Sequence, residues 1–94
     1  MTVTTFTEYF DRMAEQCDSY DQHWSAEVHR DLNQQFGRLD HDTCAEHLRK
    51  FVDECTSEMN ACSCSIEPAH GAAWARREIA KQAIRWFEGQ LILE

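Results

Sequence analysis

Apolar residues in this chain recur at steps of three and four positions, and this spacing constrains the fold more than any other feature. Residues spaced in this way share one face of an α-helix, because the helix turns by about 100° per residue. No stretch alternates between apolar and polar residues for long enough to predict a strand. The chain has only one proline and three glycines, so it contains few residues that interrupt a helix. The sequence therefore predicts an all-α fold.

Each predicted helix has its own start or stop signal. Thr5 and Glu8 form a T-x-x-E capping box at the start of the first helix, and Gly37 suits the C′ position after the second. Asp40 is a good N-cap for the third helix, and Pro68 suits the first turn of the fourth. Short loops between such helices are typical of a compact antiparallel bundle or a related orthogonal packing. The predicted helices cover approximately residues 5–19, 21–36, 40–62 and 68–88.

The apolar faces of the four helices predict the core. The fourth helix has the broadest apolar arc, and Arg76 falls inside it, so we expect Arg76 at the periphery or paired with a carboxylate. The predicted core positions are Phe6, Tyr9, Phe10, Met13, Cys17 and Tyr20, then Trp24, Val28, Leu32 and Phe36, then Cys44, Leu48, Phe51, Val52, Cys55, Met59 and Cys62, and finally Ala72, Ala75, Ile79, Ala80, Ala83, Ile84, Trp86, Phe87 and Leu91.

The length and motif content exclude several classes of protein. Ninety-four residues make a single domain, 1–94, which is small for a deep catalytic pocket. The chain contains no recognised catalytic signature and no glycine-rich phosphate loop, so we expect a protein that is not an enzyme and binds no cofactor. The absence of a signal peptide and of any long apolar run predicts a cytoplasmic protein without a membrane partner.

The charge of the chain is negative and unevenly distributed. Seventeen acidic residues face nine basic ones, for a net charge of −8. Residues 1–60 hold thirteen acids and five bases, whereas residues 61–94 hold four of each. Repulsion from phosphates disfavours direct binding of nucleic acid by the acidic part. The same charge favours binding to the basic surface of a protein that itself binds nucleic acid.

Acidic residues follow the helical spacing in rows. Carboxylates four residues apart on a helix are separated by about 6 Å along its axis. Phosphates along one DNA strand recur every ~3.4 Å of axis, so such rows approach the charge density of a nucleic acid. The alternative is an ordinary solvated face whose first-turn acids complement helix dipoles. The predicted partner-binding residues are Glu8, Asp11, Glu15 and Asp18, Glu27 and Asp31, and Asp40, Asp42 and Glu46, with Asp53, Glu54 and Glu58 as a further acidic group.

Cysteine and histidine side chains between the third and fourth helices suggest a different function. Cys55, Cys62, Cys64 and His70 are residue types that bind zinc, and Cys62 and Cys64 are spaced for a C-x-C redox pair. The spacing matches no common zinc finger, and Cys55 and Cys62 also belong to the apolar face of the third helix. A small zinc-binding or thiol redox module is therefore the alternative function. No metal is expected under the leading hypothesis.

A basic lane runs along the fourth helix. Arg77, Lys81 and Arg85 are four residues apart, and Trp74 lies on the same side. This lane predicts either a binding edge with an aromatic anchor or, as we favour, a solvated face paired with acids of other helices. A third hypothesis is that the protein is a plain structural subunit, either monomeric or homodimeric.

A very short, acidic, all-helical chain with the rows Glu8/Asp11/Glu15/Asp18, Glu27/Asp31 and Asp40/Asp42/Glu46 resembles the small phage-encoded anti-CRISPR proteins. The resemblance concerns the overall type of chain, since that group shares no motif. It implies an inhibitor that occupies the DNA-binding or PAM-reading surface of a CRISPR effector complex, in some members by mimicking DNA. It also implies a location in the cytoplasm of the host cell.

Overall fold

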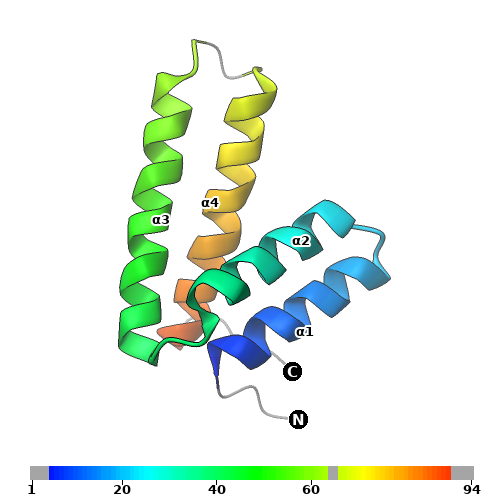
Figure 1. The fold of residues 1–94 in the computed structure, drawn as a ribbon. Helices are drawn as coiled ribbons and strands as arrows, with labels where there is room; N and C mark the ends of the chain where they lie inside the picture. The colour runs from blue at the N-terminus through cyan, green and yellow to red at the C-terminus, as the bar shows by residue number, and fades with distance from the viewer. Residues whose placement is uncertain (1–4, 64–65, 90–94) are drawn as a thin grey trace.

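The structure, a computed structural model, describes residues 5–63 and 66–89 (Figure 1). This part of the chain contains four α-helices and one π-helical turn, and it contains no strand. The predicted all-α fold of four helices is thereby confirmed. The elements in order are α1 (Phe6–Ser19), α2 (His23–Leu32), the π-helical turn η1 (Asn33–Gly37), α3 (His41–Ala61) and α4 (Pro68–Phe87).

The four helices form two antiparallel hairpins that cross at an oblique angle (Figure 1). The α1–α2 hairpin lies across the lower half of the longer α3–α4 hairpin. The upper turns of α3 and α4 extend beyond it and pack mainly against each other. The longest dimension of the molecule is therefore 44 Å, against 30 and 23 Å for the other two.

The core is centred on aromatic rings from both ends of the described chain. Phe6, Tyr9 and Phe10 of α1 are fully buried. The ring of Trp86 lies 5.0 Å from that of Tyr9 and 5.2 Å from that of Phe6, and Phe87 stacks on Phe6 at 5.3 Å. Each buried aromatic side chain contributes about 1.5–3 kcal/mol through area removed from water, and good ring pairs add about 0.5–1.5 kcal/mol. This cluster holds the two hairpins together.

Small residues of α4 let the hairpins approach closely. Ala80 and Ala83 are fully buried against the aromatic cluster, as their place in the predicted apolar arc requires. Two predicted core residues are instead largely exposed. Tyr20, at 69% exposure, caps the end of α1 beyond its last turn, and Trp24 is 45% exposed. Leu91 lies outside the described residues.

The signals predicted for the N-termini of α1, α3 and α4 are present. The side chain of Thr5 accepts a hydrogen bond from the backbone N–H of Glu8 at 3.1 Å. Asp40 accepts one from the backbone N–H of Thr43 at 3.0 Å and a second from its hydroxyl at 2.6 Å. Pro68 opens α4. Such caps satisfy N–H groups that have no partner within the helix, and each contributes about 1 kcal/mol.

The second helix differs from the prediction at both ends. Asp21 adopts a left-handed backbone with φ of +59°, so α2 begins at His23 rather than at residue 21. Its far end widens into η1, and Gly37 lies inside this turn without a positive φ, so the predicted C′ role is wrong. A Cβ at Gly37 would overlap Oδ1 of Asn33, so the Asn33 side chain would have to move to make room for it.

Candidate interaction surface

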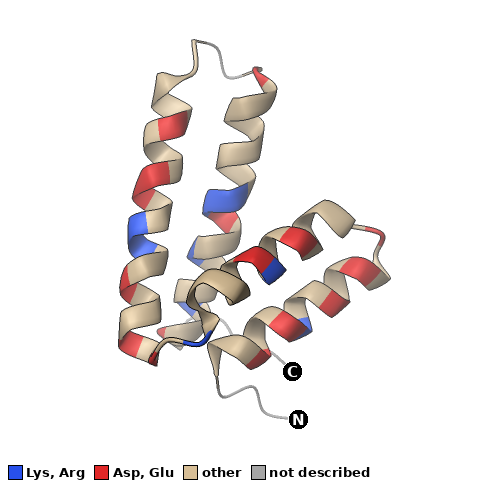
Figure 2. Cartoon of the chain, viewed as in Figure 1, with Lys and Arg blue, Asp and Glu red and all other residues tan. Residues whose placement is uncertain are grey.

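The acidic residues predicted to bind a partner all lie at the surface. Eight of the nine are exposed, and Asp18 is half-buried. The side of α1 that carries Phe6 and Phe10 faces the core, which turns its acidic side toward solvent. Figure 2 shows red segments along both helices of the α1–α2 hairpin. We call the six acids of this hairpin the acidic hairpin face: Glu8, Asp11, Glu15, Asp18, Glu27 and Asp31.

Asp18 links the two helices of the hairpin. Its carboxylate pairs with the Arg30 guanidinium, and His23 Nδ1 lies 2.8 Å from its Oδ1. The hydrogen bond from Arg30, followed by the one to His23, lowers the pKa of Asp18 below its ordinary value. Arg30 therefore partly neutralises the charge of Asp18 within the chain. Asp18 would attract a basic partner more weakly than the sequence suggests.

Asp11 is also held in place by the second helix and its π turn. Asn33 donates a hydrogen bond from Nδ2 to Asp11 at 3.0 Å. The hydroxyl of Thr7 donates to the Gly37 carbonyl at 2.8 Å, which ties α1 to the end of η1. These contacts fix the position of the Asp11 carboxylate relative to both helices, which reduces the entropy lost when a partner binds it.

Two arginines border the acidic hairpin face. A hollow of about 440 Å³ beside η1 brings Arg30 and Arg38 close to Asp11. Arg30 and Arg38 are distant from Asp11 along the chain, so the helical spacing of the acids gave no sign that these two arginines would lie beside it. The face is therefore acidic overall but has a mixed margin. The lining residues of this hollow are Thr7, Asp11, Arg30, Asn33, Gln34 and Arg38.

The acids at the start of α3 lie near the beginning of α1. The ring of His41 packs edge-on against that of Phe6 at 5.7 Å, which brings the first turns of the two helices to the same end of the molecule (Figure 1). The helix-capping bonds lower the pKa of Asp40, so its carboxylate is engaged in the fold. Asp42 and Glu46 are exposed on the following turns.

The cysteine and histidine side chains of the alternative site lie in different environments. Cys55 is buried in the core between α3 and α4, whereas Cys62 follows α3 and donates a hydrogen bond to the Glu58 carbonyl at 3.3 Å. His70 lies half-buried in the first turns of α4, and Cys64 lies outside the described residues. Within residues 5–63 and 66–89, no group of three or more His, Cys, Asp or Glu side chains is arranged to hold a metal ion.

The electrostatics around the described thiols oppose thiolate formation. Burial raises the pKa of Cys55, and the neighbouring Glu58 raises it further. Partial desolvation and then the carboxylate of Glu67 raise the pKa of Cys62. Reactive thiols require the opposite setting, with cations or helix N-termini nearby.

The basic residues of α4 divide between two environments. Arg76, expected at the periphery or beside a carboxylate, places its guanidinium over the Trp24 ring at 5.8 Å. Arg77 is half-buried, 3.5 Å from Glu78 and 3.5 Å from the Thr56 hydroxyl. Lys81 and Arg85 remain exposed and line a groove with Arg49 of α3. Sequence spacing revealed the lane on α4, but it contained no signal that Arg49 would join it.

In comparisons with known proteins, no family model, curated protein or solved structure matches this chain. In the part of the chain that the structure describes, no helix has both the length and the apolar character needed to span a membrane.

Proposed function

We propose that this chain is a non-enzymatic inhibitor or interaction protein whose acidic hairpin face binds a basic, nucleic-acid-binding surface of a partner protein. The observation that carries the proposal is the charge of the α1–α2 hairpin. Between Phe6 and Leu32 the chain holds seven acidic and two basic residues, and none of the acidic side chains is buried. Such a surface attracts arginine- and lysine-lined grooves, steers them during encounter and repels nucleic acid.

The rigidity of the hairpin supports this function. The buried rings of Phe6, Tyr9 and Phe10 fix α1 to the core, and contacts from α2 and η1 hold the carboxylates of Asp11 and Asp18. A preorganised row of charges loses little conformational freedom when it binds. A partner surface that follows the phosphates of a nucleic acid meets a similarly regular row of negative charges on α1.

The particular partner class that we propose is a CRISPR effector complex, on which the protein acts as a DNA-mimicking anti-CRISPR. The support is the resemblance in overall type to that group, together with the acidic surface. A phage-encoded protein of this kind acts in the cytoplasm of the host cell, as a monomer or a homodimer.

The test is a charge reversal that avoids the residues with structural contacts. Glu15→Lys and Glu27→Lys together change two exposed positions of the acidic hairpin face. The matched control is Glu54→Lys with Glu58→Lys, which makes the same change in net charge on exposed positions of α3. Each lost or reversed pair contributes up to about 1 kcal/mol, so the hairpin variant is expected to bind about tenfold, and at most about thirtyfold, more weakly than the control.

The assay begins with capture of partners from host lysate at low and high salt and continues with the purified partner. Support requires that the partner binds nucleic acid, that the wild-type protein competes with that nucleic acid, and that only the hairpin variant loses competition. Equal competition by the wild type and the hairpin variant would refute the proposed surface.

Zinc analysis tests the alternative function in the same preparations. Protein purified without a histidine tag is expected to contain no stoichiometric zinc. One equivalent of zinc that disappears in Cys64→Ser would replace the proposal with a metal module built on Cys55, Cys62, Cys64 and His70.

A further inference from the structure

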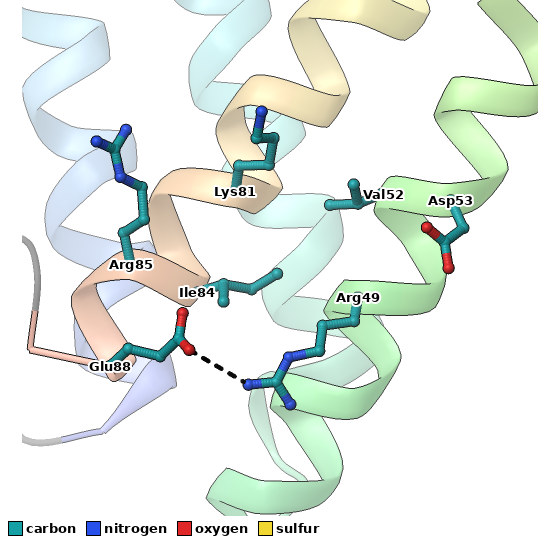
Figure 3. A pocket seen from close by; sticks show the side chains of 7 residues that line it. All are labelled: Arg49, Val52, Asp53, Lys81, Ile84, Arg85 and Glu88. Atoms are coloured by element: carbon teal, nitrogen blue, oxygen red, sulfur yellow. Dashed lines mark ion pairs between the residues drawn. The ribbon is translucent and has the colours of Figure 1, made fainter.

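A groove lined by three basic and two acidic side chains lies between the lower halves of α3 and α4 (Figure 3). Its volume is about 460 Å³, within the range of ligand sites in proteins. It lies on the long hairpin and contains no residue of the acidic hairpin face. We call it the basic groove and define it by its lining residues: Val52 and Ile84 at its floor, and Arg49, Lys81, Arg85, Asp53 and Glu88 around them.

The floor of the basic groove is apolar. Val52 of α3 and Ile84 of α4 are partly buried and pack against the hydrophobic core. In Figure 3 the two side chains lie between the charged residues of the two helices. The floor can therefore accept one apolar side chain from a partner, which would remove the exposed parts of both residues from water.

The cations around this floor are only weakly engaged. Arg49 reaches Glu88 at 3.8 Å, and Lys81 reaches Glu78 at 3.6 Å. Exposed ion pairs at such distances are weak, so a carboxylate from a partner can replace them at little cost. Arg85 is exposed and makes no ion pair with any residue that the structure describes.

The charge of α4 is opposite to that of the rest of the molecule. This helix carries four basic residues and one acidic residue, in a chain whose net charge is −8. Lys81 and Arg85 are one helical turn apart, so their Cα atoms are separated by about 6 Å along the axis. Carboxylates one turn apart on a helix, or two residues apart on a strand, have nearly the same spacing.

From these features, we propose that the basic groove binds an acidic segment of a partner protein. One apolar side chain of the segment packs on Val52 and Ile84, and carboxylates on either side of it pair with Lys81 and Arg85. A peptide that combines an apolar side chain with regularly spaced carboxylates can contact the floor and both cations at once, which a small anion cannot do because it has no apolar group for the floor. The proposal concerns a different surface and a partner of opposite charge, so it does not depend on the proposed function.

The probe is a short fluorescent peptide made of Glu-Ala-Leu-Glu repeats, and the measurement is fluorescence anisotropy. Because the protein is itself acidic, nonspecific attraction of this probe is unfavourable, and saturable binding reports a local basic site. The decisive variant is Arg85→Glu, because Arg85 lines the groove. The matched control is Lys50→Glu, an equal charge change at an exposed position of α3 that does not line it.

We expect saturable binding that weakens about tenfold in Arg85→Glu and changes less than about twofold in Lys50→Glu. A probe with serine in place of leucine is expected to bind about tenfold more weakly, because the floor then buries no apolar group. Absence of saturable binding, equal losses in the two variants, or equal affinity for the serine probe would each overturn the proposal. Self-association of the wild type that Arg85→Glu abolishes would also overturn it, because the occupant would then be a second copy of this chain.

Discussion

Acidification is expected to destabilise the fold through one buried histidine. His29 of α2 is 2% exposed and lies beside the rings of Tyr9 and Phe10, with centroids 6.4 and 6.1 Å away. Its Nδ1 is buried and has no hydrogen-bond partner among the residues that the structure describes. Burial lowers the pKa of His29 from 6.5 to about 4, because the charged imidazolium is poorly solvated in this setting.

The direction of the effect follows from the two states of the chain. The unfolded chain has the ordinary histidine pKa, so it gains a proton as the pH falls below 6.5, whereas folded His29 stays neutral down to about pH 4. Proton uptake by the unfolded state lowers the free energy of unfolding. The loss is about 2 kcal/mol between pH 7.5 and pH 5 and approaches roughly 3 kcal/mol well below pH 4.

The assay is urea denaturation followed by tryptophan fluorescence near pH 7.5 and pH 5, with His29→Leu as the test variant. Leucine has a similar volume and no titratable group, so this variant is expected to lose about 2 kcal/mol less than the wild type over that pH range. His70→Gln is the control, and it should retain the wild-type acid response because His29 is intact. If His29→Leu lost as much stability as the wild type, the buried neutral histidine could not be the source of the acid sensitivity.

Four further predictions concern packing, capping and thiol chemistry. Phe10→Ala is expected to destabilise the fold by about 3–5 kcal/mol in urea titrations, because it opens a cavity in the aromatic cluster, whereas Asp40→Ala should cost about 1 kcal/mol as a lost helix cap. Gly37→Ala should cost no more than about 1 kcal/mol in the same titrations, because the new Cβ displaces only the flexible Asn33 side chain and its hydrogen bond to Asp11; a loss of about 3 kcal/mol or more would contradict this account. Burial and then the carboxylate of Asp40 raise the pKa of Cys44 to about 11, so iodoacetamide should alkylate this thiol at the rate of unfolding and not faster.

Local sequence signals were sufficient to predict where α1, α3 and α4 begin. The caps at Thr5 and Asp40 and the proline at residue 68 are short-range features, and each helix start that they predicted is present. The start of α2 was misplaced because the left-handed conformation of Asp21 depends on the tight turn between hairpin helices. The role of Gly37 was misread because its neighbours Thr7 and Asn33 meet it only in the folded hairpin.

The candidate surfaces were predictable only in part. Helical spacing placed the acids of α1 and α2 opposite the core, and they are at the surface. The pairing of Asp18 with Arg30 and the approach of Arg49 to Glu88 join residues of different helices, and composition carries no information about such contacts. His29 is buried against Tyr9 and Phe10 of α1, and this contact between helices has no signal in the sequence, where histidine is a residue type of intermediate burial.

The contact of Phe6 with Trp86 and Phe87 has a consequence for how the chain is synthesised. These rings belong to the first turn of α1 and the last turn of α4, so the aromatic cluster cannot close until Trp86 and Phe87 have been translated. At a translation rate of about 5–20 residues per second, the interval between Phe6 and Trp86 lasts roughly 4–16 seconds. During this time α1 carries three large rings without their final partners. The nascent chain is therefore expected to be most prone to aggregation, and most dependent on chaperones, just before translation reaches the end of α4.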